Sequence, residues 1–227
     1  AFVDPIVSDY VDKIRRTLHQ AEGPPDYDIM KSGGGVVASG EIYPVEMLLS
    51  GPAGGVSGGV LLGRLMGRQN LTTFDMGGTS ADFSGILDNT PLWTDEGDID
   101  GLPIRISILD ITTVGAGGGS IAWIDQGGAL RVGPESAGSD PGPVCYGRDD
   151  AREITVTDAN LILGRLDAEH FLGGRMALDL ERARTRMQEL ARNMSLPLEA
   201  AAWGVIRVAN SNMERAIRTI SVERGHD

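Results

Sequence analysis

The spacing of apolar residues divides the chain into a helical start, a middle rich in strands and a helical end. Residues 4–21 carry apolar side chains at intervals of three and four, which predicts an amphipathic helix. Three more helices are predicted near the end of the chain, at about residues 157–164, 179–193 and 197–223. Thr157 or Asp158 is expected to cap the first of these three. The change in pattern predicts a boundary near residues 68–70.

Short extended segments fill the space between the predicted helices. Before the boundary, "YDIM" and "VEMLLS" are predicted as strands, and "GPAGGVSGGVLLGRLMG" as a loop that leads into a helix of small residues. After it, "LTTFDM" and "ADFSGIL" flank a glycine-rich turn, and "IRISILDITTV" is a longer extended run. The segments "IAWID" and "ALRVG" should form a hairpin about "QGG". Residues 134–153 are too rich in Pro and Gly for regular structure, so we expect a functional or a disordered loop.

The stretch "TTFDMGGTSADFSGI" places an acidic residue, two glycines and two hydroxyls between apolar runs. Glycines let successive backbone N–H groups approach an anion closely, and the hydroxyls of Thr79 and Ser80 add donors. Asp75 would be repelled by a phosphate but could hold Mg²⁺, usually through water. The spacing is not that of a P-loop, and no lysine follows. The alternative is a plain hairpin turn with a capping Asp.

A second glycine cluster, at residues 114–122, follows the extended run that contains Asp110. Two glycine-rich turns at strand ends could face the same ligand, although tight packing explains Gly117 and Gly118 about equally well. Asp110 interrupts an apolar run, so its side chain is either buried and paired or directed into a cleft. A strand-end turn that orients Asp110 by hydrogen bonds alone is equally consistent with the pattern.

Composition and charge exclude several classes of protein. The net charge of −12 disfavours a nucleic-acid partner, because no basic surface is left to neutralise phosphates. The single cysteine, Cys145, rules out an internal disulfide and suits a reducing cytoplasm. We interpret it as a packing residue, since the three histidines form neither a Cys–His arrangement nor a zinc site. No apolar run of membrane length and no signal peptide is present, which predicts a soluble, cytoplasmic protein.

Six segments, taken together, resemble the hydantoinase A, 5-oxoprolinase and acetone carboxylase β-subunit family over essentially the whole chain. They are "LLSGPAGGV", "FDMGGTSADFSGI", "LDITTVGAGGGSIAWID", "RVGPESAGSDPGPVCYG", "TVTDANLILGRL" and "RTISVERGHD". The chain departs from the family pattern at Ala81, usually a threonine, and at Thr112, often a larger polar residue that would shape the substrate pocket. "MKSGGGV" replaces the more usual "MQSNGGV".

The resemblance implies an α/β fold of the ribonuclease-H-like class, in which a mixed sheet is flanked by helices. This is the actin-like ATPase fold of hexokinase and of heat-shock chaperones. Residues 1–68 would be the C-terminal part of the first half plus a connecting helix, and residues 69–227 the second half with its phosphate loop. The chain opens without an initiator Met and stops after a helical pattern. We therefore expect a fragment that lacks the first phosphate loop and the adenosine-binding segment, and that is inactive alone.

The implied activity is ATP-dependent hydrolysis of a cyclic amide, of the hydantoin or 5-oxoproline type, after phosphorylation of its carbonyl oxygen. The implied cofactors are ATP and Mg²⁺, and a hydantoinase B-like second subunit is the expected partner. Asp75 would position the metal and take part in catalysis, and Asp110 would lie near the reacting carbonyl. The implied nucleotide-binding residues are Gly77, Gly78, Thr79, Ser80, Gly117 and Gly118. The alternatives are an ATP-dependent ketone carboxylase subunit and a non-catalytic, actin-like nucleotide-binding scaffold.

Overall fold

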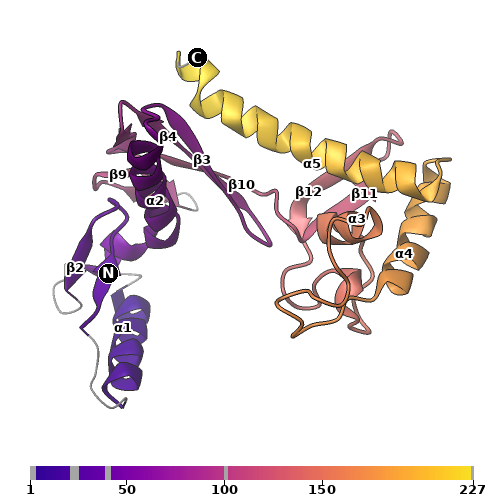
Figure 1. The fold of residues 1–227 in the computed structure, drawn as a ribbon, viewed down its shortest axis with the longest axis horizontal. Coiled ribbons are helices and arrows are strands. Elements are labelled where there is room, and N and C mark those ends of the chain that lie inside the picture. Colours follow the sequence, from indigo (N-terminus) through magenta and orange to yellow (C-terminus); the bar gives the residue numbers. More distant parts are fainter. Residues whose placement is uncertain (1–3, 21–25, 39–41, 100–101, 226–227) are drawn as a thin grey trace. The chain divides into compact units, whose positions relative to one another are not determined.

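The computed structural model describes residues 4–20, 26–38, 42–99 and 102–225, and it confirms the predicted α/β class (Figure 1). The chain divides into two compact units. Unit 1 comprises residues 1–73 and 84–111, and unit 2 comprises residues 74–83 and 112–227. The division passes through strands β3 (Leu71–Met76), β4 (Ala81–Leu87) and β10 (Ile111–Val114). The predicted assignment of residues 1–68 and 69–227 to two halves of a larger fold stays a prediction.

Unit 1 begins with the predicted amphipathic helix α1 (Asp4–His19) and continues into the antiparallel hairpin β1 (Asp28–Met30) and β2 (Val36–Ala38). Helix α2 (Ser50–Met66) packs on the strands through two glycines. A Cβ atom at Gly59 would lie 2.5 Å from Thr73 Cγ2, and one at Gly63 would lie 2.7 Å from Leu71 Cδ1. Small residues therefore bring this helix close to its neighbours, as the sequence predicted. The unit's core contains Ala53, Val56, Ile86 and Leu109.

Two predictions in unit 1 were wrong. The segment "VEMLLS" is not a strand, because Pro44–Met47 forms a short 3₁₀ helix, η1, in which Glu46 pairs with Lys31 at 3.1 Å. The stretch "GPAGGVSGGVLLGRLMG" has no loop at its start, because α2 already begins at Ser50. The physical reason is that Pro52 occupies the first turn of the helix, where backbone N–H groups have no intrahelical acceptor and proline loses nothing.

The central sheet has the order β10-β4-β3, and β5 (Thr90–Pro91) pairs with β4. Strands β3 and β4 are those that the sequence predicted, but the long extended run is divided at Asp110. Its first part, β9 (Ile108–Leu109), pairs with β6 (Trp93–Thr94), whereas β10 joins the central sheet. The short pair β7 (Gly97–Ile99) and β8 (Leu102–Ile104) carried too few residues for a periodic pattern.

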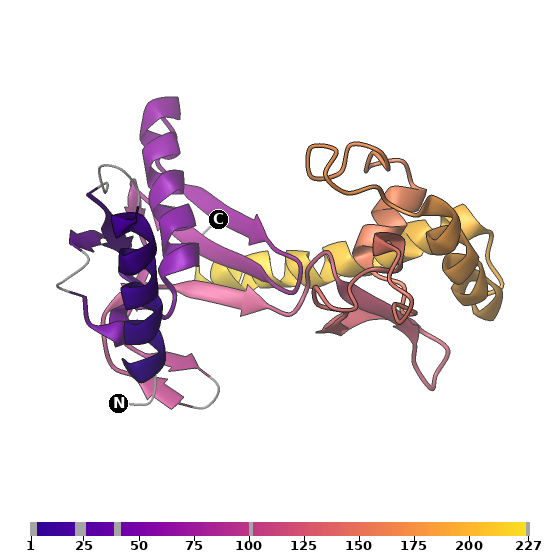
Figure 2. The same cartoon turned by 90° about the horizontal axis from the view of Figure 1, so that it is seen from below.

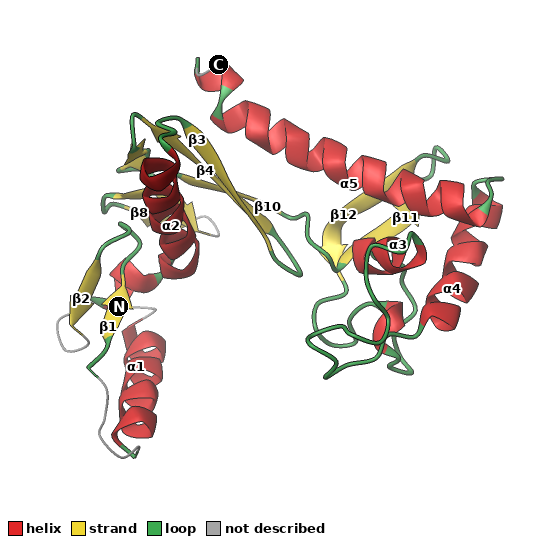
Figure 3. Ribbon diagram, viewed as in Figure 1, coloured by secondary structure: helices red, strands yellow, loops and turns green. Residues whose placement is uncertain are grey.

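Unit 2 contains the predicted hairpin, β11 (Ser120–Ile124) and β12 (Leu130–Ser136), and three helices. Helices α3 (Val156–Ile162), α4 (Leu180–Asn193) and α5 (Leu198–Ile220) contact one another and share one core (Figure 2). Residues 137–153 are loop apart from the short helical turn η2 (Val144–Tyr146), as expected from their composition (Figure 3). The predicted loop was wrong at its start, because residues 134–136 are the end of β12. In the part of the chain that the structure describes, no helix is both long and apolar enough to cross a bilayer.

Candidate functional site

The glycine-rich turn of β3 and β4 is a tight hairpin, which we call the glycine hairpin (Gly77–Ser80). Gly77 N donates to Ser80 O at 2.8 Å. Phe74 and Phe83 stack across the two strands with ring centroids 5.0 Å apart. These pairs fix the register, and they place Asp75 opposite Asp82, on the face of the sheet away from the two phenylalanines.

The outer side of the glycine hairpin is open. Gly77, Gly78 and Thr79 are exposed, and a Cβ atom at Gly78 would meet nothing within 4 Å. Among the described residues, no hydrogen-bond acceptor is found for the N–H groups of Gly78 and Thr79, and no partner for the hydroxyls of Thr79 and Ser80. This is a set of exposed donors on a short, fixed turn, which suits an anion.

The second glycine cluster backs the hairpin directly. Gly118 N donates to Gly77 O at 3.0 Å, and Gly119 N donates to Gly78 O at 2.6 Å. A Cβ atom at Gly117 would lie 2.7 Å from the carbonyl carbon and oxygen of Gly78, so no larger residue fits there without moving backbone. The structure therefore brings the two predicted glycine clusters together. The N–H groups of Gly117 and Gly118 already donate to Ser120 Oγ and Gly77 O, respectively.

Helix α3 holds the second glycine cluster from the other side. The backbone N and the Oγ1 of Thr157 both donate to Gly118 O at 2.8 Å. The predicted cap at Thr157 or Asp158 was wrong, because Thr155 is the N-cap residue and Asp158 is its capping-box partner. Thr155 has extended backbone angles and its side chain accepts from Asp158 N, which is the geometry of an N-cap.

Asp158 is a fully buried carboxylate that joins the long loop to α3. It accepts from Thr155 N at 2.9 Å and Thr155 Oγ1 at 2.8 Å, and from Cys145 N at 2.7 Å and Val144 N at 3.3 Å. These donors compensate for the burial of its charge. Burial of the Cys145 thiol, together with the nearby charge of Asp158, raises the pKa of that thiol. Cys145 is thus a buried packing residue, as the sequence indicated.

Two carboxylates lie beside the glycine hairpin. Asp75 is exposed, and Asp82, on the neighbouring strand, accepts from Thr113 Oγ1 at 2.6 Å. Like charges directly opposite each other on a sheet repel, unless a cation lies between them. Two carboxylates with water and phosphate oxygens fit Mg²⁺, which prefers oxygen ligands. The described residues contain no group of three or more His, Cys, Asp or Glu side chains that could hold a metal by themselves.

Sequence reasoning missed Asp82, although a signal was available. In a hairpin closed by Gly77 and Ser80, the residue two positions before the turn faces the residue two positions after it. Asp110, by contrast, is a partly buried residue of unit 1 whose N–H donates to Leu92 O at 2.9 Å. The glycine hairpin belongs to unit 2, so the predicted role of Asp110 near a reacting carbonyl stays a prediction.

Comparison with known proteins identifies relatives over the full length of the chain. The family model described as hydantoinase/oxoprolinase matches residues 1–227. The caprolactamase subunit alpha of Pseudomonas jessenii is 37% identical over the whole chain, and a 5-oxoprolinase of Saccharomyces cerevisiae is 39% identical. The chain spans 33% of the former and 18% of the latter.

Solved structures agree with these matches. The nucleotide-free structure of an acetone carboxylase, from a study of ATP-dependent acetone carboxylation, superposes with a TM-score of 0.85 at 29% identity. That match covers 95% of this chain and 31% of the other. The crystal structure of the ATP-dependent caprolactamase from P. jessenii superposes with a TM-score of 0.80 at 35% identity, over 99% of this chain and 33% of the other. The predicted actin-like ATPase fold class is therefore confirmed.

Proposed function

Because the chain belongs to the hydantoinase/oxoprolinase family, we propose that it is part of an ATP-dependent enzyme that hydrolyses a cyclic amide. The amide carbonyl oxygen would be phosphorylated first, which turns a poor electrophile into one that water can attack. The observation that carries the proposal is the glycine hairpin, which is open to solvent outside and fixed by backbone hydrogen bonds inside. Phosphoryl transfer depends mainly on positioning and charge neutralisation, and a fixed hairpin supplies positioning.

The residues of the hairpin would divide the work of holding the nucleotide. When bound, ATP supplies the phosphoryl group, and Mg²⁺ neutralises charge on its phosphates. The N–H groups of Gly78 and Thr79, with the hydroxyls of Thr79 and Ser80, would bind β- and γ-phosphate oxygens. Gly77 would close the turn that presents them. The N–H groups of Gly117 and Gly118 already donate hydrogen bonds within the protein, so these two residues would act by holding the hairpin in place.

The carboxylates would bind the metal rather than the phosphates. Asp75 would position Mg²⁺, usually through water, and Asp82 would share that task from the facing strand. Thr113 orients Asp82 by the hydrogen bond to its Oδ1. Asp110 is proposed as the polar group near the reacting carbonyl. A shared Mg²⁺ would offset the repulsion between these two facing carboxylates.

A second candidate is ATP-dependent carboxylation of a ketone. The acetone carboxylase match favours it, since that structure superposes well and the activation of a carbonyl oxygen is common to both reactions. We further propose a cytoplasmic protein that works with a second, hydantoinase B-like subunit. Two relatives are named as subunits, the caprolactamase subunit alpha and the acetone carboxylase beta subunit of Xanthobacter autotrophicus. A module that serves only as a scaffold would need neither Asp75 nor the open hydroxyls.

The test is calorimetric titration of Mg-ATP into the full-length natural protein. Asp75→Ala should abolish binding or remove its dependence on magnesium, because the metal loses a carboxylate. Glu214→Ala is the matched control, since it removes one exposed carboxylate from α5, outside the glycine hairpin. Unchanged Mg-ATP binding by Asp75→Ala would mean that the hairpin is a structural turn, and the scaffold interpretation would replace ours.

A further inference from the structure

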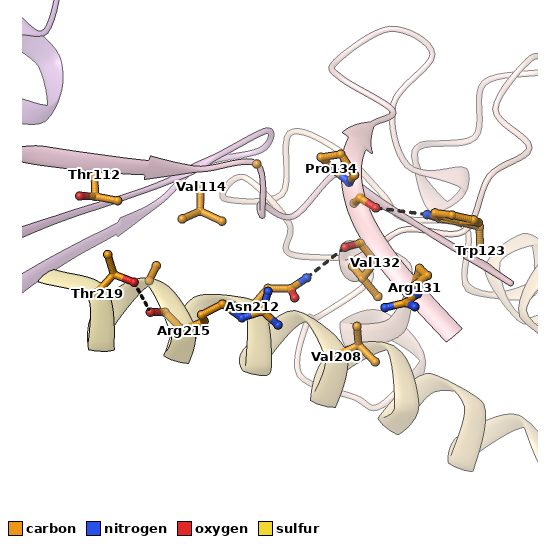
Figure 4. Close-up of a pocket in the computed structure, with 13 residues that line it drawn as sticks. Thr112, Val114, Trp123, Arg131, Val132, Pro134, Val208, Asn212, Arg215 and Thr219 are labelled. Carbon is orange, nitrogen blue, oxygen red and sulfur yellow. Dashed lines mark hydrogen bonds between the residues drawn. The ribbon is translucent and has the colours of Figure 1, made fainter. Parts of the chain in front are cut away.

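Unit 2 contains a cavity of 490 Å³ between α5, β12 and the end of β10 (Figure 4). Its volume lies in the range of about 300–1,000 Å³ typical of small-molecule sites. The apolar part of its wall is formed by Val114, Val132, Pro134, Val208 and Ala216. None of the residues that form the glycine hairpin lines this cavity, so its ligand need not be the nucleotide.

Trp123 gives the cavity a flat wall in a fixed orientation. Its indole N–H donates to Gly133 O at 3.2 Å, and the side chain is 43% exposed. A half-exposed indole whose polar group is already bonded leaves its ring as an apolar contact surface. This wall suits the apolar body of a ligand rather than a hydrogen-bonding group.

Asn212 presents an acceptor whose identity is fixed by its own hydrogen bond. Its Nδ2 donates to Val132 O at 3.1 Å, as Figure 4 shows, and a carbonyl can accept only from the nitrogen of the amide. Asn212 lines the cavity, and its Oδ1 atom receives no hydrogen bond from the described residues. It is therefore available to a ligand N–H group.

Two arginines line the cavity, and they differ in one respect. Arg131 pairs with Asp125 at 2.8 Å, which neutralises its charge locally. Arg215 has no carboxylate partner among the described residues. The positions one turn away on α5 are Ser211, Asn212, Arg218 and Thr219, and none of them is acidic. Arg215 is exposed and lines the cavity, so its guanidinium is available to a ligand.

We propose that this cavity binds a small carboxylic acid that has an apolar body and an N–H group next to the carboxylate. Arg215 pairs with the carboxylate, Asn212 Oδ1 accepts the N–H, and the apolar body contacts the Trp123 ring and the valines. N-acylated amino acids have this combination of groups. Thr112 also lines the cavity.

The experiment is calorimetric titration of the full-length natural protein, without nucleotide, with N-acetyl-leucine and with its neutral amide, N-acetyl-leucinamide. A guanidinium–carboxylate hydrogen bond should make the acid bind about 10-fold or more tightly than the amide. Arg215→Gln should remove this preference. Arg218→Gln is the matched control, since it removes the same charge one turn along α5 from a residue that does not line the cavity, and it should keep the preference.

A second probe tests the hydrogen-bond acceptor. N-methylation of N-acetyl-leucine deletes the donor for Asn212 Oδ1 and should weaken binding about 5-fold, the size of one neutral hydrogen bond. Equal binding of acid and amide, or a preference that survives Arg215→Gln, would overturn the proposal. So would no binding of either probe, which would mean that another part of the natural polypeptide fills the cavity. The titration contains no nucleotide, so failure here is distinct from failure of the proposed phosphate site.

Discussion

Substitution of Gly117 by alanine tests whether the second glycine cluster positions the glycine hairpin. The added Cβ would lie 2.7 Å from the carbonyl carbon and oxygen of Gly78 and 2.8 Å from Gly77 O. Ordinary contact begins at 3.4 Å, so the two loops must separate by the difference between 3.4 and 2.7 Å, or 0.7 Å. The atoms in the way belong to backbone, which cannot rotate aside as a side chain does.

A displacement of that size exceeds the ~0.5 Å tolerance of a productive site. We expect kcat/KM for ATP in the full-length protein to fall about 10- to 100-fold. Overpacking should also reduce the free energy of unfolding by about 1–3 kcal/mol, measured by denaturant titration. Both effects follow from the same shift of the hairpin away from its position against Gly117.

Gly55→Ala is the control for this experiment. Gly55 is an exposed residue of α2, and a Cβ atom there would meet nothing within 4 Å. The same methyl group should stabilise the helix by roughly 0.5–1 kcal/mol and leave ATP kinetics unchanged. If Gly117→Ala retains normal ATP kinetics while the protein stays folded, the glycine clusters do not position the proposed phosphate site, and our reasoning is refuted.

Three further predictions concern Thr157, Cys145 and Asp125. Thr157→Val deletes one of two hydrogen bonds to Gly118 O and should raise KM for ATP several-fold at nearly constant kcat. Thr157→Ser keeps the hydroxyl and should restore the normal KM; a KM that stays raised would exclude positioning through the hydroxyl. Burial and the charge of Asp158 raise the pKa of Cys145, so its thiol should resist alkylation at pH 8 until the protein unfolds. Stability should then fall as pH rises above the ordinary thiol pKa of 9.0, because only the unfolded chain loses the proton. The Ala129 N–H and Arg131 lower the pKa of Asp125. The ionised carboxylate therefore stabilises the fold above the ordinary pKa of 3.8, and this contribution should be lost as pH falls through the lowered pKa. Asp125→Asn should reduce that loss in acid-unfolding curves.

The longer elements of this protein could be read from its sequence, but several short strands could not. Strands β3 and β4, the hairpin of β11 and β12, and the helices α1, α4 and α5 follow from periodic apolar positions. The errors fell where local chemistry overrides periodicity. Proline and small residues at the start of α2 looked like a loop, and Thr155 precedes the residues that seemed to cap α3.

The candidate site could be predicted only in part. The residue types of the glycine hairpin, with Asp75 before it, predict an anion and a metal without any structure, and both stay predictions. Asp82 follows only once the register of the hairpin is known. In the sequence, Asp158 is only one of several polar residues near a predicted helix start. The hydrogen bonds from Val144 N and Cys145 N in the structure show that it joins the long loop to α3.

The sequence by itself determined which segments are strands and helices, where the glycines lie and which family the motifs resemble. These properties depend on residues close together in the chain, so a local pattern carries them. The tertiary structure alone decided that Gly117 lies against Gly78, that Thr157 holds Gly118 and that Asn212 meets Val132 across a cavity. Contacts of this kind join backbone groups of loops and helices far apart in the chain. Every residue except proline has the same backbone N–H and C=O groups, so the pattern of side chains does not predict which of these groups will form hydrogen bonds with each other.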